Sequence, residues 1–135
     1  MITLIDTSAW IEALRKKGDR VTRDQVRSLL EGGDARTTEP ILTEIWNGAR
    51  GSEEIAFITD MENDIPLLKC NEPVFSLSWE IAKDCRKRGF TLPSIDIIIF
   101  SVASFYKANL LHRDTHFDTL ASLQTSRKLH TGREY

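Results

Sequence analysis

The stretch that decides the fold lies near the amino terminus, where residues 2–11 carry the sequence ITLIDTSAWI. Its first four residues are apolar or β-branched and stop at Asp6, which is the pattern of a short buried strand that ends at the carboxyl edge of a parallel sheet. Thr7 and Ser8 follow as residues that cap helices, and apolar residues then recur at helical spacing. The stretch therefore predicts a strand, a connection that holds Asp6, and a helix.

The same alternation of strand and helix patterns continues along the chain. Further strands are predicted at Ala35–Thr38, Pro66–Cys70, Asn109–His112 and Lys128–His130. Helices are predicted at Thr22–Leu30, Glu39–Trp46, Ser52–Asn63, Val74–Arg88, Pro93–Phe105 and Phe117–Leu123. Strands that alternate with helices imply a parallel sheet covered on both faces, so we expect an α/β fold.

Composition and charge are those of an ordinary globular protein. Of the 135 residues, 41% are hydrophobic and 28% are charged, and this length suits one domain spanning residues 1–135. The net charge of −2 gives no overall basic field, so nucleic-acid binding must rely on local patches. Cys70 and Cys85 have no metal-ligand or redox spacing, and no leader or membrane span is evident, so we expect a cytoplasmic protein.

Four acidic residues interrupt segments that otherwise resemble protein core. Asp6 and Asp114 each follow a predicted strand, Asp96 lies in the first turn of a very apolar helix, and Glu44 lies on a mostly apolar helix. In open α/β sheets, ligands and catalytic groups collect beyond the carboxyl ends of the strands. Buried carboxylates are usually paired, and an all-oxygen set suits Mg²⁺ or Mn²⁺. The four acids are therefore candidate ligands of one metal site.

The spacing alone leaves a second interpretation open. A single aspartate after a strand is more often a turn or helix-capping residue than a catalytic one. If the four side chains converge, their like charges destabilise the fold unless cations offset them. One or two divalent ions at such a site can activate a water for phosphodiester cleavage. Convergence itself cannot be seen from the spacing.

Four segments together resemble a known protein family, and the likeness covers essentially the whole chain. They are DTSAWI at residues 6–11, PILTEI at 40–45, PSID at 93–96 and LHRDTHFD at 111–118. In order and spacing they resemble the signature segments of PIN-domain proteins of the VapC toxin type. Each segment alone is weak, but four in the right order in a chain of this length make a strong joint signal.

This resemblance implies a fold, an activity and partners. The fold is a three-layer α/β/α PIN domain with a central, mainly parallel sheet of four to five strands. The activity is that of an Mg²⁺-dependent endoribonuclease, with Mn²⁺ as a substitute ion, which cuts tRNA, rRNA or mRNA and inhibits translation as the toxin of a type II toxin–antitoxin pair. The implied partners are RNA, a VapB-like antitoxin and a second copy of the chain, because the family usually forms homodimers. No membrane partner is expected.

The resemblance also assigns roles to residues. The family's acidic positions, which are catalytic and bind the metal, are matched by Asp6, Glu44, Asp96 and Asp114. Thr7 or Ser8 matches the hydroxyl that supports the first aspartate. The family often has an acid where His116 stands, which is a departure in the last loop. Asp118 is either a second-ion ligand or a first-turn residue favoured by the helix dipole.

Other polar and aromatic residues have two interpretations each. His112 and His116 flank Asp114, yet no third zinc ligand is evident, so polar loop residues or phosphate contacts are favoured over a zinc site. Basic runs at residues 15–20 and 83–88 are either solvated surface or a means of steering an RNA backbone. Trp10 and Trp46 are better explained as core or dimer contacts than as base-stacking platforms.

Two rival functions fit the sequence less well. A phosphotransfer domain that uses Asp6 needs a second acid close to it and a lysine at a late strand edge, whereas Thr7 and Ser8 follow Asp6 and the late strand ends in His112-Arg113-Asp114. The alternative to the nuclease is a catalytically inactive PIN-like module that only binds RNA or a protein. Clustered negative charge near a phosphate backbone argues against that module.

Overall fold

The computed structural model describes residues 1–131, with side chains up to residue 124. Three parallel strands form its sheet in the order β2-β1-β3: β1 (Thr3–Ile5), β2 (Ala35–Arg36) and β3 (Asn109–Leu111). The middle strand β1 is buried along its whole length, as its apolar sequence predicts. The α/β fold with a parallel sheet is therefore confirmed.

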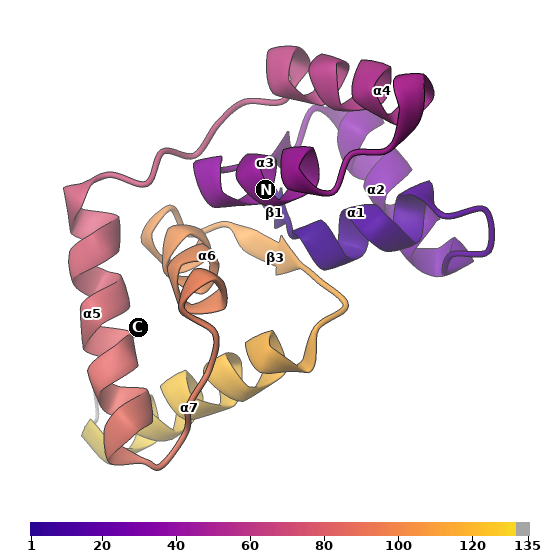
Figure 1. Cartoon of the computed structure of the whole chain (residues 1–135). Helices are drawn as coiled ribbons and strands as arrows, with labels where there is room; N and C mark the ends of the chain where they lie inside the picture. Colours follow the sequence, from indigo (N-terminus) through magenta and orange to yellow (C-terminus); the bar gives the residue numbers. More distant parts are fainter. Residues whose placement is uncertain (132–135) are drawn as a thin grey trace.

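Seven helices lie in the described part of the chain (Figure 1). Two of them connect β1 to β2, namely α1 (Thr7–Leu14) and α2 (Arg20–Gly32). Four connect β2 to β3, namely α3 (Glu39–Asn47), α4 (Gly51–Asp64), α5 (Glu72–Lys87) and α6 (Ser94–Phe105). The last, α7 (Thr115–Thr131), follows β3. No helix among residues 1–131 is long and apolar enough to cross a membrane.

The strand order places a topological switch point at the carboxyl ends of β1 and β3. The chain leaves β1 for β2 on one edge of the sheet and later adds β3 on the other edge. Where successive connections diverge in this way, parallel sheets leave a crevice beyond the strand ends. Asp6 follows β1 directly and Asp114 follows β3, so the strand order brings these two acids to the same crevice.

The core forms around β1 and α6. Helix α6 packs along α5 and also contacts α3, α7 and β3, which explains why its sequence is apolar on nearly every side. The largest fully buried side chains of the core include Trp10, Phe117, Leu4, Ile5, Ile41, Ile58, Ile81 and Ile99. Trp10 is thus a core residue, as expected. The packing fixes the first turn of α6, and with it Asp96, relative to the sheet.

The strand predicted at Pro66–Cys70 is reduced to a single bridge between Thr37 and Leu67. Two backbone hydrogen bonds form there, from the Thr37 N–H to the Pro66 carbonyl and from the Leu68 N–H to the Thr37 carbonyl. Beyond them side chains replace the ladder, because the Thr38 hydroxyl donates to the Leu68 carbonyl and the Glu39 carboxylate accepts from the Cys70 N–H. The segment is therefore extended without forming a regular strand.

The edge strand predicted at Lys128–His130 is wrong, because these residues belong to α7. The helix predicted at Phe117–Leu123 runs instead from Thr115 to Thr131. Its whole length lacks Gly and Pro, and the residues after Leu123 include the good helix formers Gln, Arg and Lys, so nothing local ends the helix. The sheet of the described chain accordingly has three strands rather than the expected four to five.

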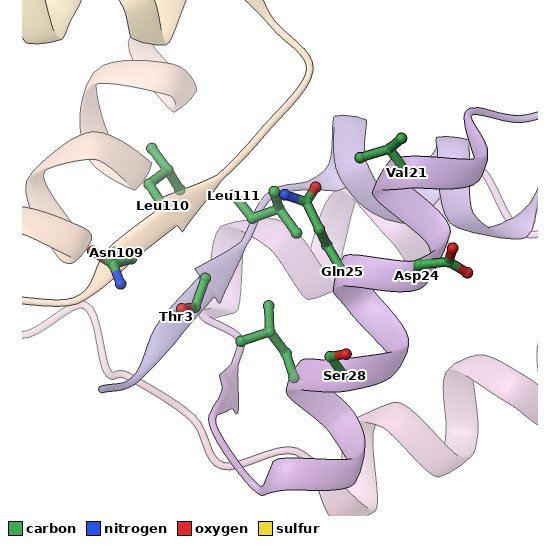
Figure 2. Close-up of a pocket in the computed structure, with 9 residues that line it drawn as sticks. Thr3, Val21, Asp24, Gln25, Ser28, Asn109, Leu110 and Leu111 are labelled. Carbon is green, nitrogen blue, oxygen red and sulfur yellow. The ribbon is translucent and has the colours of Figure 1, made fainter.

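A groove of about 580 Å³ separates α2 from the β1–β3 pair. Figure 2 shows Val21, Gln25 and Ser28 of α2 along one wall and residues 109–111 of β3 along the other. None of the four acids singled out by the sequence lines this groove. The groove is thus separate from the crevice at the carboxyl ends of the strands.

Candidate metal centre

Asp6 is the most buried of the four acids, with 4% of its surface exposed. Its N–H donates to the Leu111 carbonyl at 2.9 Å, which fixes it to β3. Its carboxylate caps α1 by accepting from the backbone N–H of Ser8 at 3.0 Å and from the Ser8 hydroxyl at 2.5 Å. The Ser8 hydroxyl in turn accepts from the Arg113 N–H at 2.9 Å. Ser8 therefore ties the first acid to the loop that carries Asp114.

Asp96 and Asp114 meet through a histidine. Nδ1 of His116 lies 2.8 Å from Oδ2 of Asp96 and 3.1 Å from Oδ1 of Asp114. The backbone N–H of His116 also donates to Oδ1 of Asp114 at 2.9 Å. Within the described part of the chain, these residues form the one group of three whose ligand atoms all lie within 4.8 Å of one another. The first turn of α6 and the start of α7 are thereby joined.

Glu44 faces the same pocket from α3. Its Oε1 accepts a hydrogen bond from the Thr7 hydroxyl at 2.8 Å. Burial raises the pKa of Glu44, and the charges of the other three acids, Asp6, Asp96 and Asp114, raise it further. The structure thus brings together all four acids that the sequence singled out. It also separates the roles of the two hydroxyls, because Ser8 supports Asp6 whereas Thr7 supports Glu44.

Asp118 and His112 lie to one side of this pocket. The Asp118 side chain is 72% exposed, and its carboxylate is 3.8 Å from Nε2 of His112. His112 packs its ring on Phe117 and accepts at Nδ1 from the Asp114 N–H. The two imidazoles thus contact different carboxylates, since His112 lies beside that of Asp118 and His116 beside those of Asp96 and Asp114.

The basic run at the end of α5 is not placed beside the acids. Arg88 contacts Asp84 at 3.4 Å and donates to the Leu123 carbonyl on α7 at 3.3 Å. In Figure 1 this end of α5 lies against the late part of α7, away from the end of β3. Arg113, beside Asp114, is the nearer cation, and it lies 3.7 Å from Asp19. Its position next to Asp114 in the sequence is the signal that could have singled it out.

The residues present fit a divalent cation. The charges of Asp6 and Asp114 raise the pKa values of both Glu44 and Asp96, so the four carboxylates lie near enough to repel one another. Carboxylate oxygens are the donors that hard divalent cations prefer. A cation held there would remove the repulsion. The arrangement is therefore suited to bind a divalent metal ion.

Comparison with known proteins agrees with this geometry. A family model of the PIN domain matches residues 3–123. The chain belongs to the PIN-domain family. Ribonuclease VapC11 of Mycobacterium tuberculosis is 35% identical to this PIN domain over 124 residues, which cover 89% of this chain and 92% of the relative. The resemblance to VapC-type proteins is thereby confirmed.

Two solved structures share the fold of this PIN domain. VapBC-1 from nontypeable Haemophilus influenzae superimposes with a TM-score of 0.72 at 21% identity, over 90% of this chain and 93% of that one. A toxin–antitoxin complex from Klebsiella pneumoniae does so with a TM-score of 0.67 at 16% identity, over 84% and 87% of the two chains. The likeness extends over most of the sheet and its helices.

His116 is the residue of this PIN domain whose position the sequence did not predict. It was expected either as a polar loop residue or as a phosphate contact, whereas its ring lies between two of the acids. Its spacing of two residues from Asp114, at the start of a helix, is the available signal. That spacing places it on the same crevice, but the contact with Asp96 depends on how α6 packs.

Ser8→Ala is expected to weaken divalent-metal binding about 10-fold to 100-fold, because Asp6 loses a hydrogen bond that orients its carboxylate. The backbone N–H of residue 8 keeps its bond to Asp6, so α1 should still form. Calorimetric titration with Mn²⁺ measures the affinity. Ser28→Ala, on the exposed surface of α2, is the matched control. Equal affinities of Ser8→Ala and the parent chain would contradict the role given to Ser8.

Three pKa shifts in the pocket share one sign. Burial, followed by neighbouring carboxylates, raises the pKa values of Glu44 and Asp96, and the hydrogen bond to Asp96 raises the pKa of His116. Each group holds its proton more tightly in the folded chain than in the unfolded one. The contribution of these protonated groups to the free energy of unfolding is therefore present at low pH. It is lost as the pH rises through the pKa values of the folded chain.

This sign predicts how the metal-free protein responds to pH. In chelator, Glu44→Gln is expected to have a higher Tm than the parent chain above about pH 6, by about 2 °C, and the difference should shrink toward about pH 4. Saturating Mn²⁺ should reduce the difference as well, because the cation offsets the charge of Glu44. Thermal melts across the pH range measure both effects. A Glu44→Gln protein that is less stable at high pH would refute the assignment.

Proposed function

We propose that the chain is a divalent-metal-dependent endoribonuclease, the toxin of a type II toxin–antitoxin pair. Mg²⁺ is the proposed ion and Mn²⁺ its substitute. The observation that carries the proposal is the convergence of Asp6, Glu44, Asp96 and Asp114 at one sheet edge of a PIN domain. The ribonuclease relative, 35% identical over most of both chains, supports the choice of RNA as substrate.

Asp6, Asp96 and Asp114 would hold the cation. When bound, the cation lowers the pKa of a water molecule and stabilises charge on the leaving oxygen of the phosphodiester. The remaining work falls to the chain itself. Ser8 keeps the Asp6 carboxylate oriented, and the packing of α6 holds Asp96 in place. A ligand set fixed before the substrate arrives costs little reorganisation during the reaction.

Glu44 is proposed to handle a proton. It lies on α3 beside the three proposed ligands, and in the metal-free chain burial and the charges of those acids raise the pKa of its carboxyl group, which favours its protonated form relative to an ordinary glutamate. Thr7 holds Oε1, which leaves Oε2 as the atom that carries the proton. This role differs from that of Asp6, which accepts two hydrogen bonds from Ser8 that keep its side chain oriented.

Arg113 is the proposed first contact for the RNA backbone. Its side chain is 53% exposed, its backbone N–H binds Ser8, and it adjoins Asp114 in the sequence. A phosphate approaching an acidic pocket needs a cation at the rim, because the chain as a whole carries no basic field to attract RNA. The exposed ion pair with Asp19 is weak enough to be exchanged for a phosphate.

The activity is tested with the purified full-length chain and single-stranded RNA. Cleavage is expected with Mg²⁺ or Mn²⁺, is expected to stop in excess chelator, and should return when either ion is restored. A preparation of Asp96→Asn purified in parallel controls for contaminating nucleases. Cleavage that persists in chelator, or that is equal in the control preparation, would overturn the proposed function.

The proposed partners are a VapB-like antitoxin and a second copy of the chain. The fold shared with the toxin–antitoxin complex from Klebsiella pneumoniae supports the first of these. A small protein encoded beside this chain is expected to copurify with it on coexpression and to suppress cleavage. Light scattering on the isolated chain tests the homodimer, for which twice the chain mass of 15.4 kDa is expected.

The alternative of an inactive PIN-like binding module is not favoured. Such a module gains nothing from four carboxylates that raise one another's pKa values, because the repulsion lowers stability without a compensating ligand. A chain that binds RNA equally well with and without divalent ions, and leaves it intact, would restore this alternative.

A further inference from the structure

His116 holds a position that a metal ligand would hold. Its Nδ1 lies 2.8 Å from Oδ2 of Asp96 and 3.1 Å from Oδ1 of Asp114. The backbone of His116 is fixed as well, because its N–H donates a hydrogen bond to the Asp114 carboxylate. The side chain is 42% exposed, so the nitrogen can be reached by an ion from solvent. One imidazole nitrogen and two carboxylates therefore converge on a single small volume.

The spacing of these three ligand atoms matches that around a six-coordinate ion. Metal–oxygen distances of about 2.1 Å place neighbouring ligands of an octahedron about 3 Å apart and opposite ligands about 4.2 Å apart. The two nitrogen–oxygen distances equal the neighbouring spacing, and the whole group fits within 4.8 Å. The histidine makes two such contacts, one with Asp96 in the first turn of α6 and one with Asp114 in the loop after β3.

We propose that His116 is a nitrogen ligand of the metal centre, together with Asp96 and Asp114, and that it biases the centre toward first-row transition ions such as Mn²⁺ over Mg²⁺. The inference rests on the proposed function, since it concerns the same site. Mg²⁺ strongly prefers oxygen donors, whereas an imidazole adds affinity for transition ions. The carboxylates of Asp6, Asp96 and Asp114 still supply oxygen donors, so Mg²⁺ is weakened relative to Mn²⁺ rather than excluded.

In the opposing interpretation, His116 does not bind the metal. In that case its ring serves only as a hydrogen-bond partner that lowers the repulsion between Asp96 and Asp114, and the ion binds oxygen atoms alone. The two interpretations differ in a directly observable property. A ligating histidine puts a nitrogen nucleus in the coordination sphere of bound Mn²⁺, whereas a hydrogen-bonded one is displaced from it.

Pulsed electron paramagnetic resonance of the Mn²⁺-loaded full-length chain detects that nitrogen. A ¹⁴N coupling is expected in the parent chain and in His112→Asn, whose Asn oxygen can still accept from the Asp114 N–H. The coupling should be lost in His116→Asn. Titrations of the same proteins should show Mn²⁺ affinity falling about 10-fold in His116→Asn, with a smaller change for Mg²⁺. His116→Asp, which replaces the nitrogen donor with carboxylate oxygens, should bind Mg²⁺ more tightly than His116→Asn without restoring the nitrogen signal.

The possible failures are distinguishable. Mn²⁺ that binds without a ¹⁴N coupling, or with one that survives in His116→Asn, overturns the ligand role and leaves the proposed function intact. If the chain has no Mn²⁺ site, or if its Mn²⁺ site persists in Asp96→Asn, both the ligand role of His116 and the proposed function are overturned. A preference for Mn²⁺ over Mg²⁺ that is unchanged in His116→Asn overturns the bias toward transition ions.

Discussion

Asp96→Asn is expected to reduce RNA cleavage by about 100-fold or more. Removing a group that merely orients a metal ligand costs about 10-fold to 100-fold, and Asp96 is itself a proposed ligand, so its loss should cost at least the upper end of that range. The carboxylate lies beside His116 and Asp114, and its side chain is only 14% exposed. Asparagine keeps the shape while removing the charge. Initial cleavage rates at saturating Mg²⁺ and Mn²⁺ measure the effect.

The fold of this variant should survive. Burial and neighbouring acids raise the pKa of Asp96, which means that its charge is unfavourable in the metal-free chain. Replacing it with a neutral group should therefore leave the Tm unchanged or slightly higher in chelator. Asp118→Asn is the matched control, because the Asp118 side chain is exposed. In the described part of the chain, its one ion pair is with His112. Equal losses of cleavage rate in Asp96→Asn and Asp118→Asn would contradict the proposal that Asp96, and not Asp118, is a metal ligand.

Phe117→Ala is expected to cost about 3–5 kcal/mol of unfolding free energy, the usual penalty for deleting a buried aromatic ring. Phe117 is 1% exposed, and its ring packs against that of His112. It anchors the first turns of α7 directly after His116. A loss of this size is a large part of the roughly 5–15 kcal/mol that stabilises a typical domain and would lower the Tm by about 10–20 °C. Urea denaturation of the metal-free protein measures it.

Two controls separate core packing from other effects. Phe105→Ala removes the same ring from a position that is 40% exposed at the end of α6, and it should cost within about 1 kcal/mol. Phe117→Leu keeps most of the buried volume and should recover most of the loss. Equal destabilisation by Phe117→Ala and Phe105→Ala would show that Phe117 does not anchor α7.

The local patterns predicted the arrangement around β1 well. Apolar, partly β-branched residues before Asp6 form a buried middle strand, and Asp6 caps the helix that follows. These features depend on neighbours within a few residues, so the sequence contains the information needed to predict them. The apolar sequence of α6 likewise predicted a helix packed on several sides.

The late part of the chain was predicted less well for a physical reason. An edge strand forms only if it can pair by hydrogen bonds with a neighbouring strand. A short run such as Lys128–His130 does not reveal whether such a neighbour exists. Helix propensity without a Gly or Pro stop extended α7 through these residues instead. At Pro66–Cys70, side chains of Thr38 and Glu39 took hydrogen bonds that a regular strand would have given to its neighbour.

The sequence by itself determined which acids are placed at strand ends and helix starts, because a strand that stops at an aspartate and a proline that opens a helix are local facts. Only the tertiary structure decided that the acids converge. Thr7 reaches Glu44 across 37 residues, and His116 reaches Asp96 across 20. Such contacts depend on how α3 and α6 pack around the sheet, and that packing is a property of the whole core rather than of any segment. The same packing decides that the Ser8 hydroxyl donates to Asp6 while the Thr7 hydroxyl donates to Glu44. It also places the imidazole of His116 between two carboxylates.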